Sequence, residues 1–124
     1  MLQLRSIINA ADNTGAKKLS VIQAYGDSKR KFAYIGDVIC CIVKEADPLG
    51  VVKQHELVKA IIVRTRKEHR RTDGSYIRFD DNAAIIIDNT KDKNPLGSRV
   101  FGPIARELKD LGYNKIISLA QEVY

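Results

Sequence analysis

The sequence is poor in the residues that most often carry chemistry or a dense core. Its 124 residues include no tryptophan, two cysteines and two histidines, and aromatic side chains make up only 6% of the chain. Any core must therefore be built mainly from Ile, Val, Leu and Ala. The length predicts one domain, residues 1–124. The hydrophobic fraction of 44% is enough for that domain to bury a core of its own.

The two cysteines, Cys40 and Cys41, are adjacent, which excludes a relaxed disulfide between them. Neighbours on a strand point to opposite faces, so we interpret them as small apolar residues of a protein in a reducing compartment. No apolar run approaches the roughly 18 residues of a membrane span. We therefore expect no membrane partner, and the first residues show no signal-peptide pattern.

Sites for metals, cofactors and catalysis are also missing. His55 and His69 belong to no ligand set, since adjacent cysteines do not chelate as a spaced pair would. The carboxylates of Asp80-Asp81 should diverge into a solvated turn rather than form an acid/base pair. The glycines are isolated and make no phosphate-binding loop. We expect no cofactor, no metal and no enzymatic activity.

Short apolar runs separated by Gly, Pro, Asn and Asp fill the first 88 residues. This density of strands and turns predicts a mainly β fold, either a barrel or a sandwich. Two runs, Ile61-Ile62-Val63 and Ile85-Ile86-Ile87, are unbroken, which indicates strands buried on both faces or a barrel covered by another element. The expected strands are Ser6–Ala11, Leu19–Tyr25, Asp37–Lys44, Leu57–Arg66, Ser75–Phe79 and Ala83–Ile87.

The last third of the chain has a different pattern. Asn89–Gly97 is polar and predicts a loop. Residues 103–111 fit a short helix with Pro103 in its first turn, and Gly112 is placed to end it. Lys115–Ala120 predicts a further strand. The helix has one apolar face, which we expect to be intramolecular core, although a partner protein could dock on it instead. That face consists of Ile104, Leu108 and Leu111.

A basic segment carries the strongest functional signal. The chain has a net charge of +6, and five of the eight residues in Arg64–Arg71 are Arg or Lys. A turn at Asp73-Gly74 predicts a hairpin that returns through Ser75–Phe79. Because one guanidinium can hold two phosphate oxygens, this hairpin predicts a nucleic-acid contact. The expected phosphate contacts are Arg64, Arg66, Lys67, Arg70, Arg71 and Arg78, with weaker patches at Lys17, Lys18, Lys29, Arg30 and Lys31.

Three readings of the hairpin remain open from the residues alone. It could be a phosphate clamp, a charged hairpin that is merely solvated, or part of a free single-strand-binding barrel. The last would use Tyr76 and Phe79 as stacking platforms, but we expect both rings to face a core. The clamp predicts that replacing Arg70 and Arg71 together makes the salt dependence of RNA binding shallower by about two log–log units or slightly less.

Several segments, in order along essentially the whole chain, resemble the universal large-subunit ribosomal protein fourteen family of bacterial and organellar type. The departures are modest: Ile85 stands where the family usually has Val, and His55-Glu56 replaces a Gly-Asp turn. The matching segments are Ala11–Ala16, Ile35–Asp37, Ala60–Val63 followed by Asp73-Gly74, Phe79, Asn82 and Ile85–Ile87, then Ser98–Pro103, Ala105–Leu108 and Lys115–Ala120.

The resemblance implies a small five-stranded β-barrel, about residues 1–88, followed by a C-terminal region of short helices and loops, about residues 89–124. It implies a structural constituent of the large ribosomal subunit that binds large-subunit ribosomal RNA at the subunit interface. Implied partners are a neighbouring large-subunit protein, small-subunit RNA through an intersubunit bridge, and a ribosome-silencing factor on the C-terminal face. The ribosome would be that of a bacterial cytoplasm or an organelle. The implied protein-facing residues are Ser98, Arg99, Phe101, Arg106 and Lys115.

Overall fold

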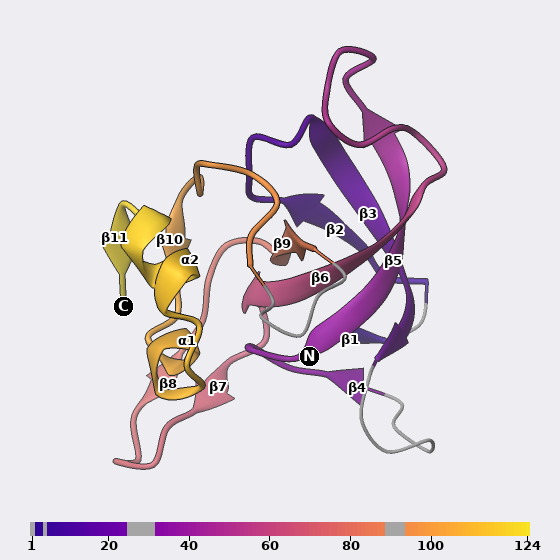
Figure 1. Cartoon of the computed structure of the whole chain (residues 1–124). Coiled ribbons are helices and arrows are strands. Elements are labelled where there is room, and N and C mark those ends of the chain that lie inside the picture. Colours follow the sequence, from indigo (N-terminus) through magenta and orange to yellow (C-terminus); the bar gives the residue numbers. More distant parts are fainter. Residues whose placement is uncertain (1, 4, 25–31, 89–93) are drawn as a thin grey trace.

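Five strands close into a barrel in the computed structural model, which describes residues 2–3, 5–24, 32–88 and 94–124. Neighbouring strands pair in the order β2-β3-β5-β6-β9, and β9 returns to β2 (Figure 1). Every pair is antiparallel except β2 with β9, where Asn9 lies opposite Ala83. This confirms the predicted mainly β, five-stranded barrel. The strands are β2 (Ile7–Ala10), β3 (Ala16–Ala24), β5 (Val38–Ala46), β6 (Leu57–Arg64) and β9 (Ala83–Ile87).

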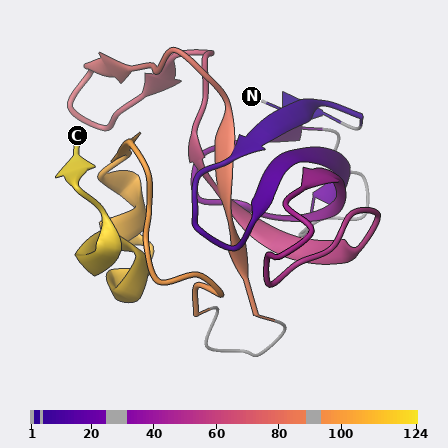
Figure 2. The same cartoon turned by 90° about the horizontal axis from the view of Figure 1, so that it is seen from above.

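Short elements extend the barrel at its ends. Three two-stranded pairings join β1 to β4, β7 to β8, and, in parallel, β10 to β11. Seen in two directions, the β7–β8 hairpin and the C-terminal elements lie on the same side of the barrel (Figures 1 and 2). The elements are β1 (Leu2–Gln3), β4 (Phe32–Ala33), β7 (His69–Arg70), β8 (Tyr76–Ile77), β10 (Pro103–Ile104), α1 (Glu107–Asp110), α2 (Asn114–Leu119) and β11 (Glu122–Val123).

The two unbroken apolar runs serve two separate cores. On β9, Ala84 and Ile86 point into the barrel, while Ile85 and Ile87 point outward into a second apolar cluster. All five residues of β9 are buried. The outward cluster is closed by the C-terminal region, which contributes Ile104, Leu108 and Ile116. Both readings of the runs are therefore confirmed, because the strands are buried on both faces and another element covers the barrel.

The C-terminal secondary structure differs from the prediction. Pro103-Ile104 is not the first turn of a helix but a strand beside Glu122-Val123, and helix α1 covers only Glu107–Asp110. The segment stays extended because its backbone is bonded to the barrel, the Ala105 amide donating to the Val63 carbonyl at 3.3 Å. Residues 114–119 form a helix rather than the expected strand.

The expected apolar face is intramolecular at two of its three positions. Ile104 and Leu108 are fully buried, whereas Leu111 is 57% exposed. Leu111 lies against Gly36, where a Cβ would come within 2.3 Å of its Cδ1 atom. Gly112 follows α1 in a left-handed conformation with φ +90°, as expected of a residue that ends a helix.

The adjacent cysteines occupy opposite faces of β5, as expected. Cys41 points into the barrel core, where burial raises the pKa of its thiol to about 12, while Cys40 is half-buried on the other face. At the turn before β6, His55 adopts φ +69°, in the left-handed region that favours glycine. No helix in the described part of the chain is long and apolar enough to cross a membrane.

Candidate nucleic-acid interface

The basic segment forms the expected hairpin. His69 pairs with Ile77 and Arg70 with Tyr76, and the chain turns back between Arg71 and Ser75. Gly74 takes φ +88° in the turn, a conformation for which glycine has no steric penalty. The Asp73 carboxylate accepts hydrogen bonds from the amide and hydroxyl of Ser75, which lower the pKa of Asp73 together with the nearby charges of Arg106 and Arg71.

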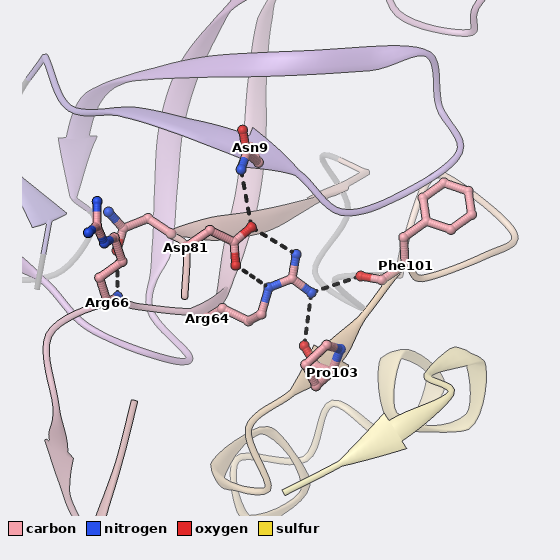
Figure 3. A network of polar contacts seen from close by, with 7 residues as sticks. Asn9, Arg64, Arg66, Asp81, Phe101 and Pro103 are labelled. Atoms are coloured by element: carbon pink, nitrogen blue, oxygen red, sulfur yellow. Dashed lines mark hydrogen bonds and ion pairs between the residues drawn. The ribbon is translucent and has the colours of Figure 1, made fainter. Parts of the chain in front are cut away.

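The first arginine of the segment, Arg64, lies buried at the base of the hairpin. It is 7% exposed, and its guanidinium makes four intramolecular hydrogen bonds (Figure 3). Nε and Nη2 form a two-pronged pair with the Asp81 carboxylate at 3.0 and 3.3 Å. Nη1 donates to the carbonyl oxygens of Phe101 and Pro103 at 2.8 and 2.9 Å. A guanidinium engaged in this way has little left to offer a phosphate, so we remove Arg64 from the expected contacts.

Asp81 is the counter-charge that makes this burial tolerable. Burial opposes its ionisation, but hydrogen bonds from Asn9 and Arg64, with the charge of Arg64, outweigh that effect and lower the pKa of Asp81. The Asn9 side chain donates to its Oδ2 atom at 3.1 Å. The expected solvated pair is thus half right, since Asp80 is exposed but Asp81 pairs with Arg64, which in turn joins the barrel to the C-terminal region.

A second arginine, Arg71, holds the hairpin against the C-terminal region. Its Nε atom donates to Oε1 of Glu107 on α1 at 2.6 Å, and its Nη2 donates to the carbonyl oxygen of Tyr124. The Arg71 and Glu107 side chains are only 15% and 19% exposed. Arg71 is therefore a brace that fixes the hairpin direction, and it is poorly placed to be one of the expected phosphate contacts.

The remaining cations of the segment face solvent. Arg66, Arg70 and Arg78 are exposed and form no ion pair with another residue among those the structure describes. Lys67 is also exposed and lies 3.7 Å from the carboxylate of Glu68. Hydrogen bonding to its own backbone amide, followed by the charge of Lys67, lowers the pKa of Glu68. We call Arg66, Lys67, Arg70 and Arg78 the outward cations.

Two weaker patches have different outcomes. The pairing of β3 with β5 shifts register around Lys18, and this irregularity leaves both Lys17 and Lys18 exposed although neighbours on a strand normally alternate. Lys18 pairs with Asn9, whose side chain reaches Asp81, so this patch adjoins the hairpin base. Lys29, Arg30 and Lys31 lie outside the described residues.

The residues implied to face a protein are all exposed, but different contacts hold them in place. The Asn13 side chain accepts hydrogen bonds from the amides of Ser98 and Arg99 at 2.8 and 3.1 Å and donates to the Ser98 hydroxyl at 2.9 Å. Phe101 is 48% exposed, and its backbone amide donates a hydrogen bond to the Ala11 carbonyl at 2.7 Å, which fixes its position. The other two are Arg106, whose charge reaches Asp73 of the hairpin turn, and Lys115 on α2.

The sequence-based reading missed the exposure of one aromatic ring. Phe79 is partly buried against the barrel core as expected, but Tyr76 is 63% exposed, so the expectation of core packing is wrong for Tyr76. In the structure Tyr76 lies opposite Arg70 in a strand of only two residues, shorter than the expected Ser75–Phe79. In the described residues, no group of three His, Cys, Asp or Glu side chains gathers where it could hold a metal ion.

One comparison with known proteins bears on this surface. The family model described as Ribosomal protein L14p/L23e matches residues 1–124, the whole chain.

Proposed function

The chain belongs to the ribosomal protein L14p/L23e family, and from that premise we propose that the outward cations of its hairpin bind large-subunit ribosomal RNA. Proteins of this family are structural constituents of the large ribosomal subunit that bind ribosomal RNA, and they are not enzymes. The observation that carries the finer assignment is that Arg66, Arg70 and Arg78 are exposed and unpaired among the described residues.

The proposed mechanism divides the cations into clamp and scaffold. The outward cations, with Lys17 and Lys18 beside the hairpin base, neutralise phosphates and release their counterions. Arg64 and Arg71 hold the hairpin rigid against the barrel and α1, so that little conformational entropy is lost when RNA binds. Base sequence need not be read, since folded RNA is recognised largely by shape and backbone.

The proposal extends to the protein-facing side. We propose that Ser98, Arg99, Phe101 and Lys115 contact a protein partner, either a neighbouring large-subunit protein or a ribosome-silencing factor. Support comes from Asn13, whose three hydrogen bonds fix the 98–99 segment before any partner arrives. Arg106 belongs on this account to the hairpin side. A bridge to small-subunit RNA, and a place in a bacterial or an organellar ribosome, complete the proposal.

Two neighbouring arginines test the mechanism. Affinity of the purified protein for a large-subunit RNA transcript is measured between about 50 and 300 mM salt. Arg70→Ala should make the log–log salt slope shallower by about 0.7–0.9 units, because one phosphate contact is lost. Arg71→Ala should leave the slope unchanged while lowering the thermal stability, because it removes a brace. The double variant should then change the slope by about one unit rather than two.

Lys53→Ala is the matched control. It removes an exposed cation from the β5–β6 connection, which lies at the far end of the molecule from the hairpin (Figures 1 and 2). Its slope should equal that of the unaltered protein. A slope that changes with Arg71→Ala but not with Arg70→Ala would overturn the division into clamp and scaffold.

A further inference from the structure

The hairpin presents an aromatic ring to solvent between two arginines. Tyr76 is 63% exposed, and a single exposed ring is by itself no evidence of a binding site. The residues around Tyr76 supply that evidence. Arg70 is its direct partner across the β7–β8 pair, so the two side chains lie on the same face of the hairpin. Arg78 lies just beyond the end of β8 and lines the same surface hollow as Tyr76.

An open hollow in the surface adjoins this ring. It has a volume of about 470 Å³ and is lined by Glu68, Tyr76, Ile77 and Arg78. That volume falls within the range of small-ligand sites. The lining combines a flat aromatic face, an aliphatic side chain, one cation and one carboxylate. Arg70, paired with Tyr76 across the two strands, adds a second cation to the same face of the hairpin.

Resting on the proposed RNA binding, we propose that this face is a nucleotide site in which an unpaired base stacks on Tyr76. Arg70 and Arg78 hold the phosphates on either side of that nucleotide. A ring flanked by two guanidinium groups suits a polyanion that also has flat faces, which describes a single-stranded nucleotide and not an apolar peptide. The clamp described above reads only the backbone, whereas this site requires a base that is splayed out of its helix.

Glu68 gives the site a preference among bases. Its side chain lines the hollow beside Tyr76, with the carboxylate 3.7 Å from the Lys67 ammonium, and an ionised carboxylate only accepts hydrogen bonds. Among the bases, guanine carries two adjacent donors on its pairing edge, N1–H and the N2 amino group, which match two carboxylate oxygens. The site therefore selects a bulged or looped guanine.

Three variants separate stacking from charge in the RNA-binding assay. Tyr76→Leu should weaken binding roughly five- to a hundredfold with an unchanged salt slope, because the ring carries no charge. Tyr76→Phe should restore most of the affinity, since it keeps the aromatic face. Tyr34→Leu is the matched control; it removes a ring that is 43% exposed elsewhere in the chain, and its affinity should stay the same. All three should melt close to the unaltered protein.

A second measurement addresses the base. The full chain, labelled at tyrosine, is titrated by NMR with guanosine, adenosine, cytidine and uridine 5′-monophosphates. Guanosine monophosphate should shift the Tyr76 ring signals most strongly, with at least about fivefold tighter binding than the others, and Glu68→Gln should abolish that preference.

The outcomes distinguish the two proposals. The nucleotide site is refuted, while the phosphate clamp stands, if two results are obtained together. Tyr76→Leu binds RNA as tightly as the unaltered protein, and no monophosphate shifts the Tyr76 ring signals of the unaltered protein. If the unaltered protein shows no salt-dependent RNA binding at all, the clamp itself is refuted. Equal shifts with all four monophosphates would overturn the guanine preference and keep the stacking.

Discussion

The base and the tip of the hairpin each carry an arginine, but the two arginines have opposite environments. At the base, Arg64 is 7% exposed and all its contacts are intramolecular. At the tip, Arg70 is exposed and pairs with nothing in the described part of the chain. Six positions separate these two arginines, yet one joins the barrel to the C-terminal region and the other is free to meet a ligand. The comparison teaches that burial, not charge density, decides which cation of a basic cluster is left free for a ligand.

The physical basis of the difference is the cost of desolvating a charge. A buried guanidinium is tolerated only when its donors and its charge are both satisfied. Asp81 supplies the charge at the base, and two backbone carbonyls accept the remaining hydrogen bonds. At the tip the guanidinium groups remain in water, which leaves their donors available for the polyanion proposed above.

The sharpest way to break the comparison is to truncate both arginines. Arg64→Ala should lower the free energy of unfolding by about 2–4 kcal/mol, because it leaves Asp81 and two carbonyl oxygens without partners. Arg70→Ala should change it by no more than about 0.5 kcal/mol, as is usual for exposed positions. Urea denaturation of both variants measures the difference. Equal losses would show that burial does not separate the two residues.

Two glycines extend the comparison from side chains to backbone. Gly102 has φ +79°, and a Cβ there would come within 2.6 Å of Nη1 of Arg64. Gly74, at the tip, has φ +88° but no atom within 4 Å of such a Cβ. Gly74→Ala should therefore cost about 1 kcal/mol for the left-handed backbone alone. Gly102→Ala should cost about 2–3 kcal/mol, because it also displaces Arg64. Thermal denaturation of the pair tests this order.

The third expected effect depends on pH. The pKa of Asp81 is lowered in the folded protein from its ordinary value of 3.8, so its pairing adds stability above that value. This stability is lost as the pH falls through the lower folded pKa. Asp81→Asn keeps a side-chain acceptor for Arg64 but removes the counter-charge of that buried guanidinium, so it should cost about 2 kcal/mol at pH 7 and less as the pH falls below 3.8. If the difference in unfolding free energy between Asp81→Asn and the unaltered protein grew as the pH fell, the stabilising role of the Asp81 carboxylate would be contradicted.

The barrel could be predicted because its strands are written in local patterns. Ala83–Ile87 is an unbroken apolar run, and a strand with apolar residues on both faces is stable only when both faces are buried. The turn at Asp73-Gly74 could be predicted equally well, because an Asp-Gly dipeptide favours a tight hairpin turn. These features depend on neighbours in sequence, and the sequence contains that information.

The C-terminal region was misread where distant contacts override local preference. Ile104 and Leu108 have helical spacing and are both buried, yet Ile104 is held in a strand by β11 and by the backbone of β6. The apolar segment near residue 116 reads equally well as strand or helix, and packing of Ile116 into the outward cluster decides it.

The candidate site shows the same limit. Arg64 and Arg71 were indistinguishable from the outward cations, because their partners Asp81 and Glu107 are separated from them by intervening chain. Tyr76 was expected in a core because aromatic residues in strands usually face inward. Its position in a two-residue strand that projects beyond the barrel leaves it no core to enter.

The parallel pairing of β2 with β9 has a consequence for how the chain is made. Asn9 emerges early during translation, but its partner Ala83 emerges much later, so the barrel stays open through most of synthesis. Even after closure, Ile85 and its outward neighbours remain uncovered until α2 has been added. A nascent chain that stalled between these two points would expose an isoleucine-rich surface, and exposed apolar surface of this kind favours aggregation.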